Sequence, residues 1–203
     1  MVGIETKKKV RLVDYHGRRS GVIATIAKDI ARREEIGVEF YSGGLPQSDG
    51  GGYNQESDKI VGVRYALPFR DTEVKGLAEL IEKTEVGPIS KEEIIESDLI
   101  LTINPHIIEG MKKSDLDTQR TQPLMSYLGY KDWRLWKDAP DYVLERIMAD
   151  IGKGPKMEIY CYKSVFTQQR ATEGSKEAFA IYAQDAIHAA KELVAKLKGD
   201  IKR

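Results

Sequence analysis

Residues 10–21 read Val-Arg-Leu-Val-Asp-Tyr-His-Gly-Arg-Arg-Ser-Gly, which predicts a short strand, a polar turn and the start of a helix. The apolar run ends at Asp14, and from Gly21 onward apolar residues recur with helical spacing. Unpaired backbone N–H groups and the helix dipole both favour an anion at the start of a helix. Arg18 and Arg19 add positive charge there. We therefore predict an anion-binding turn, with a plain polar turn bearing solvated arginines as the alternative.

Composition limits the classes to which the protein can belong. A chain of 203 residues suits one domain, and its 32 Lys and Arg balance its 32 Asp and Glu. That balance disfavours non-specific binding to nucleic acid. No apolar run reaches the roughly 18–20 residues of a membrane span, and residues 1–9 lack the apolar core of a secretory signal. We expect a cytoplasmic protein with no membrane or nucleic-acid partner.

Predicted strands and helices alternate along the chain, which is typical of βαβ units around a mainly parallel sheet. Strands are expected at residues 10–14, 38–41, 98–103 and 157–165, with a further short strand at 60–67 closed by Pro68. Helices are expected at 21–33, 74–81, from Lys91, from Ile107, at 141–151 and at 175–198, with short helical pieces up to Tyr130. Asp71 or Thr72 would cap the second helix, and residues 90–93, Ser-Lys-Glu-Glu, form a capping-box pattern.

The fold class predicted from this alternation is a three-layer, flavodoxin-like α/β domain with a mainly parallel sheet of four to five strands. Residues 1–203 are expected to form a single domain. Within it, residues 1–9 are interpreted as a flexible tail and residues 45–58 as a flexible glycine-rich loop.

Polar residues follow three of the predicted strands. In open α/β sheets the ligand lies beyond the carboxyl ends of the strands, so these residues are expected to share one site. Each also has a plainer interpretation as a turn or capping residue. The predicted ligand-binding residues are Gly17, Arg18, Arg19, Ser20, Gly21, Ser42, Asn104 and His106. His16 or Asp138 would supply any acid–base step, although Asp138 also suits the cap of a helix beginning near Pro140.

The order of several segments resembles the low-molecular-weight protein tyrosine phosphatases and the arsenate reductase-like proteins. Arg19-Ser20 at a helix start is similar to their phosphate loop, and residues 38–45, Val-Glu-Phe-Tyr-Ser-Gly-Gly-Leu, resemble their second strand and its turn. Residues 90–103 resemble their helix and following apolar strand. Residues 136–141, Trp-Lys-Asp-Ala-Pro-Asp, resemble the loop that carries their general acid. The resemblance extends from residue 10 to about residue 142 and implies a phosphotyrosine phosphatase I-like fold.

The sequence departs from that family at the nucleophile. The family pattern is a cysteine, five residues and then Arg-Ser, but Val13 stands six residues before Arg19. Shifting the pattern by one or two places meets Asp14 or Tyr15. The only cysteine, Cys161, falls in a late predicted strand, where a small buried hydrophobic residue is the expected role. The resemblance therefore implies an anion-binding loop that lacks the catalytic cysteine.

The sequence gives less support to a nucleotide-binding or metal-binding site. The chain has no G-x-x-x-x-G-K-[ST] loop, and the glycines at 50–52 do not match dinucleotide spacing. Asp14, His16 and His106 would be adequate zinc ligands if they met, but the assignment we favour has no metal and no cofactor.

The function favoured by the sequence is a phosphatase-related domain that binds a phosphorylated or anionic small ligand without cysteine-based catalysis. If it is an enzyme, we expect a non-cysteine hydrolase or transferase. The alternative is a non-enzymatic interaction or assembly subunit, in which residues 45–58 with Trp133 and Trp136 would contact a protein partner or a second copy of the chain.

Overall fold

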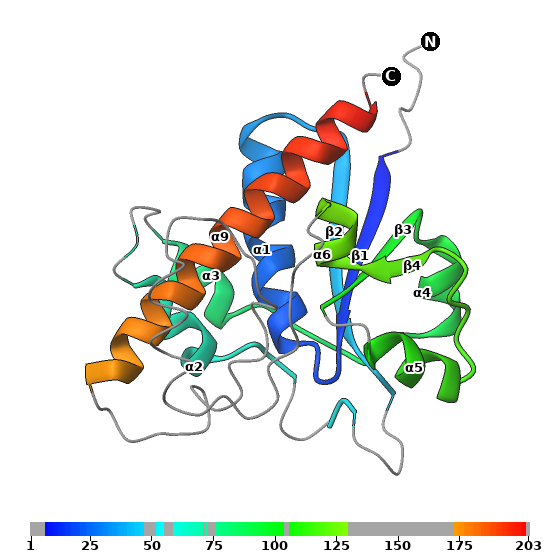
Figure 1. The fold of residues 1–203 in the computed structure, drawn as a ribbon, viewed down its shortest axis with the longest axis horizontal. Helices are drawn as coiled ribbons and strands as arrows, with labels where there is room; N and C mark the ends of the chain where they lie inside the picture. Colours follow the sequence, from blue (N-terminus) through cyan, green and yellow to red (C-terminus); the bar gives the residue numbers. More distant parts are fainter. Residues whose placement is uncertain are drawn as a thin grey trace.

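The computed structural model describes residues 7–46, 52–54, 59–70, 72, 76–103, 106–129 and 173–201. At its centre is a four-stranded parallel sheet with the strand order β2-β1-β3-β4 (Figure 1). The strands are β1 (Lys8–Asp14), β2 (Val38–Gly44), β3 (Leu99–Thr102) and β4 (Thr121–Pro123).

The central strands are buried on both faces. Every residue of β1 from Val10 to Asp14 is buried, and Ile100 in β3 has no exposed surface. Such continuous burial requires helices on both sides of a parallel sheet. In β2, buried Phe40 is followed by exposed Tyr41, because one face of this strand is less completely covered.

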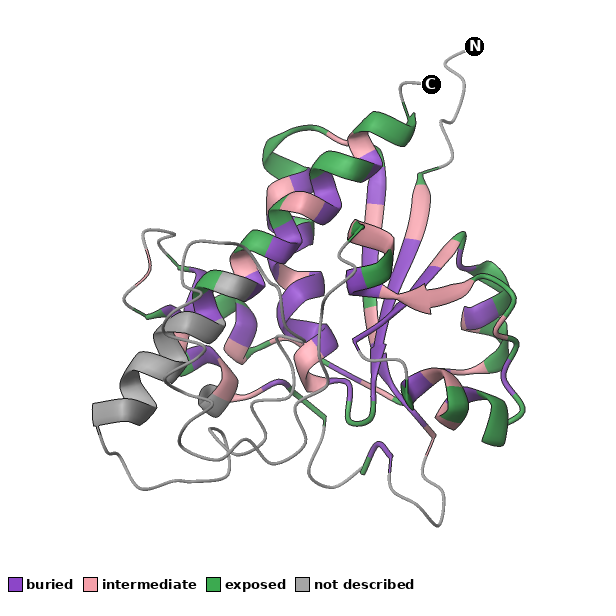
Figure 2. Ribbon diagram, viewed as in Figure 1, coloured by how far each residue is buried: buried purple, intermediate pink, exposed green. Residues whose placement is uncertain are grey.

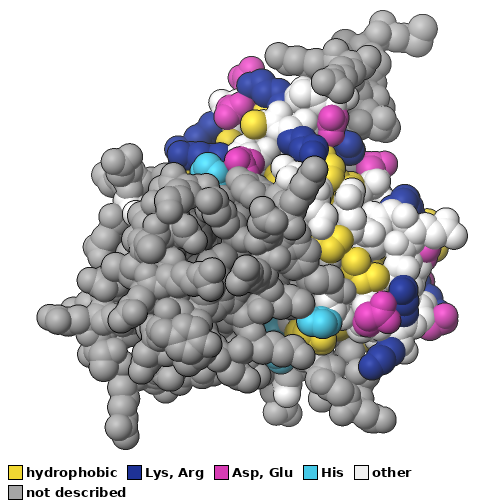
Figure 3. All heavy atoms as spheres, in the orientation of Figure 1, with side chains coloured by type: hydrophobic (Ala, Val, Ile, Leu, Met, Phe, Trp, Pro, Cys, Tyr) yellow, Lys and Arg dark blue, Asp and Glu magenta, His cyan; other side chains and the backbone are white. Residues whose placement is uncertain are grey.

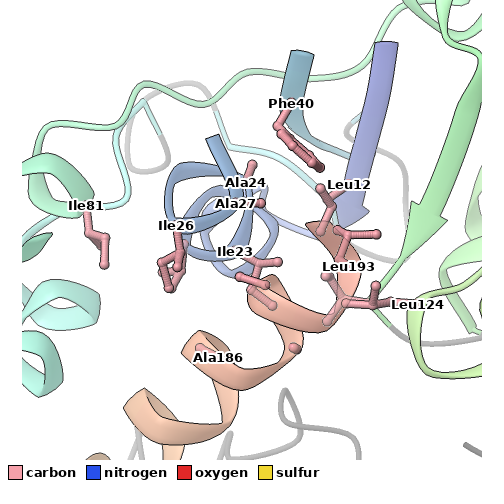
Figure 4. Close-up of a cluster of buried hydrophobic side chains, with 14 of the residues drawn as sticks. Leu12, Ile23, Ala24, Ile26, Ala27, Phe40, Ile81, Leu124, Ala186 and Leu193 are labelled. Carbon is pink, nitrogen blue, oxygen red and sulfur yellow. The ribbon is translucent and has the colours of Figure 1, made fainter. Parts of the chain in front are cut away.

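One face of the sheet is covered by α1 (Arg18–Arg33) and α9 (Glu173–Ile201), which pack against each other. Figure 4 shows Leu12 of β1, Ile23 of α1 and Leu193 of α9 in the core between these layers, and all three are fully buried. Alanines at the helix contact allow a close approach, because helix spacing depends on the side chains between the axes. The buried alanines are Ala24, Ala27 and Ala31 in α1 and Ala183, Ala186, Ala189 and Ala190 in α9.

Short elements extend this layer. The segment between β2 and α4 forms α2 (Val63–Ala66), the 3₁₀ helix η1 (Leu67–Phe69) and α3 (Leu77–Glu82), and α6 (Leu124–Leu128) follows β4. Buried residues of these elements, among them Phe69, Ile81 and Leu124, belong to the same core cluster as α1 and α9. Burial is concentrated between the layers, and the outer helix faces are exposed (Figure 2).

The opposite face is covered by α4 (Lys91–Glu96) and α5 (His106–Lys113). A second cluster joins Val13 and Ile100 of the sheet to Ile94 of α4 and Ile107 of α5. Helices on both faces of a parallel sheet give the three-layer architecture that the sequence predicted.

Two local predictions in the segment after β2 are wrong. Residues 60–67 form no strand: Ile60 makes one isolated bridge, and helical turns begin at Val63. Pro68 does not close a strand but lies in the first turn of η1, where its fixed φ and missing N–H are tolerated. The N-cap of α3 is Gly76 (φ 80°) rather than Asp71 or Thr72, so this helix begins later than predicted.

Other boundaries shift by a few residues. β1 begins at Lys8, so Lys8 and Lys9 belong to the sheet and not to the predicted tail, because Lys8 pairs with Val38. β4 was not predicted, since its three residues are too few to produce a strand pattern. The predicted strand at 157–165 and helix at 141–151 lie outside the described residues. Among the described helices, none combines the length and apolar character that crossing a membrane requires.

Candidate anion-binding loop

The carboxylate of Asp14, the last residue of β1, is held by backbone N–H groups of the loop that follows it. The N–H groups of His16 and Gly17 donate to Oδ1 at 2.7 and 2.5 Å, and that of Ser20 donates to Oδ2 at 2.7 Å. Asp14 is only 6% exposed. Hydrogen bonds to an ionised carboxylate are shorter and stronger than neutral ones. The loop therefore already contains an anionic group on which three backbone donors converge.

The first turn of α1 is fixed around that carboxylate. Gly17 is the N-cap and has φ 79° and ψ −13°, a left-handed conformation that glycine adopts without a steric penalty. The hydroxyl of Ser20 donates to the Gly17 carbonyl at 2.9 Å, and the N–H of Gly21 donates to the same oxygen at 2.8 Å. Ser20 is fully buried, so it contributes to the framework of the loop.

The end of β2 packs directly against the loop. A Cβ added to Gly44 would lie 2.9 Å from the carbonyl carbon of His16 and 3.0 Å from the nitrogen of Gly17. One added to Gly43 would lie 2.1 Å from Cγ2 of Ile89. Gly44 therefore allows a backbone approach to the loop that a side chain would prevent, whereas Gly43 leaves room for the side chain of Ile89.

Most of the predicted site residues lie at this loop. The structure brings together His16, Gly17, Arg18, Arg19, Ser20, Gly21 and Ser42. Ser42 belongs to the group because its Oγ is 3.6 Å from the position of a Cβ added to Gly21. His106 is exposed at the start of α5, just after β3, which pairs in parallel with β1. Asn104 and Asp138 lie outside the described residues.

Other predicted features fall on residues that the structure does not describe. These are Cys161, Trp133 and Trp136, and residues 47–51 and 55–58 of the glycine-rich loop. The interaction-subunit alternative depends on these segments.

Three of the predicted ligand donors make bonds within the chain. The N–H groups of Gly17 and Ser20 donate to Asp14, and the N–H of Gly21 closes the first turn of α1. An external anion can use the Gly17 and Ser20 donors only after the Asp14 carboxylate has left them. Arg18 and Arg19 are half-buried in the first turn of α1, where the sequence placed positive charge beside the helix start.

The side chain that enters the loop is that of Asp14, not that of Val13. Val13 has no exposed surface and packs with Ile100 and Ile107 on the α4 and α5 side of the sheet. Successive strand residues point to opposite faces, so Asp14 is directed to the other side, where α1 begins. The family spacing places Val13 at the position of the catalytic cysteine, whereas the structure places the side chain of its neighbour, Asp14, in the loop.

The alternative of a zinc site built from Asp14, His16 and His106 is not supported. Within the described residues, no group of three or more His, Cys, Asp or Glu side chains could hold a metal ion. Both Asp14 oxygens accept hydrogen bonds from the backbone instead.

Sequence reasoning considered Asp14 only as a metal ligand and missed its main role. A signal was present, because Asp is a preferred partner for N–H groups at a helix start and here it directly precedes the Gly-Arg-Arg-Ser turn. The signal was hidden by distance: Asp14 lies three residues before the N-cap, Gly17, whereas a capping side chain normally belongs to the N-cap itself.

Charge is mixed on the one face of the molecule that Figure 3 shows. In Figure 3, lysine and arginine side chains are interspersed with aspartate and glutamate over the part of this face where side chains are described. This agrees with the equal numbers of acidic and basic residues. The features that favour an anion at the loop are therefore local: its backbone donors and its two arginines.

Comparisons with known proteins separate sequence similarity from fold similarity. No protein-family model and no curated protein matches the sequence. Solved structures nevertheless match almost the whole chain. A variant of the arginine phosphatase YwlE with a phosphorylated active-site serine has a TM-score of 0.57 at 14% identity and covers 95% of this chain and 97% of its own.

Two further matches point to the same group. A low-molecular-weight protein tyrosine phosphatase from Bacillus subtilis has a TM-score of 0.55 at 15% identity and covers 96% of this chain and 99% of its own. Wzb from Vibrio vulnificus, in complex with benzylphosphonate, has a TM-score of 0.54 at 15% identity and covers 94% and 99%. The chain has the α/β fold of the low-molecular-weight protein tyrosine phosphatases, as the sequence resemblance implied.

Proposed function

We propose that this protein is a phosphatase-related domain that binds a phosphorylated or otherwise anionic small ligand at the β1–α1 loop and does not use cysteine chemistry. Arg18 and Arg19 would hold the anion by charge, and the loop N–H groups would donate hydrogen bonds to it. His16, exposed beside the loop, would supply any proton transfer.

The observation that carries the proposal is the convergence of backbone donors. The N–H groups of His16, Gly17 and Ser20 point at one carboxylate over 2.5–2.7 Å. A carboxylate and a phosphoryl group are both oxyanions that accept several short hydrogen bonds, so a loop built around the first has the geometry for the second. The loop also lies beyond the carboxyl end of a central parallel strand, where α/β sheets bind ligands.

The fold comparisons support the same assignment. One similar structure holds benzylphosphonate and another carries a phosphorylated serine in its active site, so this fold accommodates phosphoryl-like groups in other proteins. The proposal departs from those proteins at the nucleophile. Val13, six residues before Arg19, is a buried hydrocarbon and cannot attack phosphorus.

Anion binding is tested by the effect of inorganic phosphate on the melting temperature. A ligand that binds only the folded protein stabilises it according to its concentration over its dissociation constant. We expect phosphate to raise the melting temperature of the wild type and Arg19→Ala to lose most of that rise, since a charge-assisted contact contributes about 1.5–3 kcal/mol.

Arg32→Ala is the matched control for this experiment. It removes one arginine from the opposite end of the same helix, where Arg32 pairs with Asp29 at 3.0 Å. Its absolute melting temperature can change, but the rise caused by phosphate should equal that of the wild type. Equal rises in all three proteins would place phosphate elsewhere and contradict the proposal.

The absence of cysteine chemistry has its own test. Wild type and Cys161→Ser are assayed with an aryl phosphate before and after thiol alkylation. We expect no cysteine-dependent turnover. Turnover in the wild type that is lost both on alkylation and in Cys161→Ser would refute this part of the proposal.

A further inference from the structure

Asp14 does not occupy the usual position of a residue that caps a helix. A carboxylate at a helix start usually comes from the N-cap or the first turn, whereas Asp14 reaches forward from the end of β1. Its two oxygens take donors from both parts of the loop: Oδ1 those of His16 and Gly17 before the helix, and Oδ2 that of Ser20 within its first turn. The carboxylate thus sits at the centre of the loop.

An external anion cannot bind to the loop donors while the Asp14 carboxylate occupies them. The Asp14 carboxylate is nearly excluded from water, and like charges in such a setting repel strongly. The same three N–H groups also cannot donate fully to two acceptors at once. The loop itself packs closely against the end of β2, since a Cβ on Gly44 would meet the backbone of His16 at 2.9 Å.

We propose that Asp14 is an internal competitor of the ligand: its carboxylate occupies the loop donors, and an external anion binds by displacing it. This rests on the proposed function, because it concerns the same loop. The competitor is attached to the chain, so its effective concentration at the donors is high and fixed. The loop would then hold any anion more weakly than its donors alone allow, and contacts to Arg18 or Arg19 would help a ligand such as phosphate to displace Asp14.

The proposal is tested by measuring the affinity for inorganic phosphate and for sulfate by calorimetry in wild type and in Asp14→Asn. The asparagine keeps the size of the side chain and removes its charge. A tethered competitor predicts that the dissociation constant falls by at least about tenfold in Asp14→Asn. Asp14→Ser, which also lacks the charge, should show the same gain and serves if the asparagine variant folds poorly.

Asp29→Asn is the control for net charge. Asp29 is buried in α1 and pairs with Arg32 and Arg33, so its substitution removes one negative charge from the protein without touching the loop. We expect its affinity for both anions to equal that of the wild type. A gain as large as that of Asp14→Asn would reduce the effect to general electrostatics and overturn the proposal.

The outcomes separate this inference from the proposed function. Binding to wild type with an unchanged affinity in both Asp14 variants would refute the competitor and leave the anion-binding function standing. No binding by wild type or by any folded Asp14 variant would refute both. A merely structural role of Asp14 predicts lower stability of the variants with no gain in affinity, and this result would also overturn the inference.

A measurement on the wild type alone adds a check that needs no variant. If phosphate displaces Asp14, the amide resonances of His16, Gly17 and Ser20 should shift together during a phosphate titration, because their hydrogen-bond acceptor changes. Titration shifts at other residues, with these three unmoved, would contradict displacement.

Discussion

Two helices of this protein begin in different ways. At α4, Ser90 and Glu93 form a capping box: the Ser90 hydroxyl accepts from the Glu93 N–H at 3.2 Å, and the Glu93 carboxylate accepts from the Ser90 N–H at 2.9 Å. At α1 the N-cap is Gly17, and the acceptor for the N–H groups is the carboxylate of Asp14 at the end of the preceding strand. The capping box is local and partly solvated, whereas the Asp14 carboxylate is buried in a loop that other elements hold in place.

The two helix starts differ in how far they depend on other elements of the structure. A capping box satisfies orphan N–H groups with side chains two or three residues away and needs nothing else. The α1 start instead requires a left-handed Gly17 and a glycine at the end of β2, Gly44, where the backbone of β2 approaches that of the loop. The α1 start therefore depends on tertiary packing.

The largest expected effect is the loss of stability when the carboxylate at the start of α1 is removed. Asp14→Ala leaves three N–H groups without their acceptor, and those of Gly17 and Ser20 are in buried hydrogen bonds, where each unsatisfied group costs about 1–3 kcal/mol. We expect a loss of at least about 2 kcal/mol in the free energy of unfolding, measured by urea denaturation in buffer free of phosphate and sulfate. A loss below about 1 kcal/mol, no greater than that of an ordinary cap, would mean that the loop donors do not depend on Asp14.

The next largest loss of stability should come from disturbing the packing of β2 against the loop. Gly44→Ala places a Cβ 2.9 Å from the carbonyl carbon of His16 and 2.9 Å from Cβ of Tyr53, so backbone must move. We expect a loss of about 1–3 kcal/mol, as for other overpacked sites.

Gly37→Ala is the control for this substitution, because a Cβ there meets nothing within 4 Å. Its effect should stay within about 0.5 kcal/mol, as for exposed sites away from special features. Equal stability of the two alanine variants in denaturation would show that the loop is not held closely against β2.

Removing half of the capping box at α4 should reduce stability less than either change at the α1 loop. Ser90→Ala removes one half of the capping box, and the loss of such a cap costs about 1 kcal/mol. Thermal or urea denaturation measures the change. An unchanged stability would show that solvent satisfies the α4 donors equally well, which would weaken the contrast between the two helix starts.

The smallest effect concerns the titration of Glu92 in the first turn of α4. The backbone N–H of Glu92 and then the Ser90 hydroxyl lower the pKa of its carboxyl below the ordinary value of 4.5. Because the folded pKa is the lower one, the contribution to stability is present above the unfolded pKa and is lost as the pH falls through the folded pKa. A carboxyl NMR titration should show that Ser90→Ala raises the pKa of Glu92. An identical titration curve in the variant would exclude the serine contribution.

The fold was largely predictable because its signals are local. The buried run of β1, the helical spacing after Gly21 and the capping box at Ser90 each arise within a few residues, and the structure confirms all three. The errors arose where local pattern is ambiguous. Residues 60–67 are apolar enough for a strand, but the proline that was expected to end it begins a 3₁₀ turn.

The position of the β1–α1 loop in the fold was predictable, but its internal contacts were not. The sequence located the loop, and the structure gathers His16, Ser20 and Ser42 there. It could not reveal that the loop donors bind Asp14, because that depends on the exact end of β1 and on which face each strand residue takes. A shift of one residue in that boundary would exchange Val13 and Asp14 between the core and the loop.

The central claim is that the Asp14 carboxylate fills the β1–α1 loop, and a crystal structure of the wild type grown without phosphate or sulfate tests it most directly. We predict one Asp14 oxygen within hydrogen-bond distance of the nitrogens of His16 and Gly17 and the other within that distance of the Ser20 nitrogen. An Asp14 side chain turned out of the loop, with water at those nitrogens, would contradict the account.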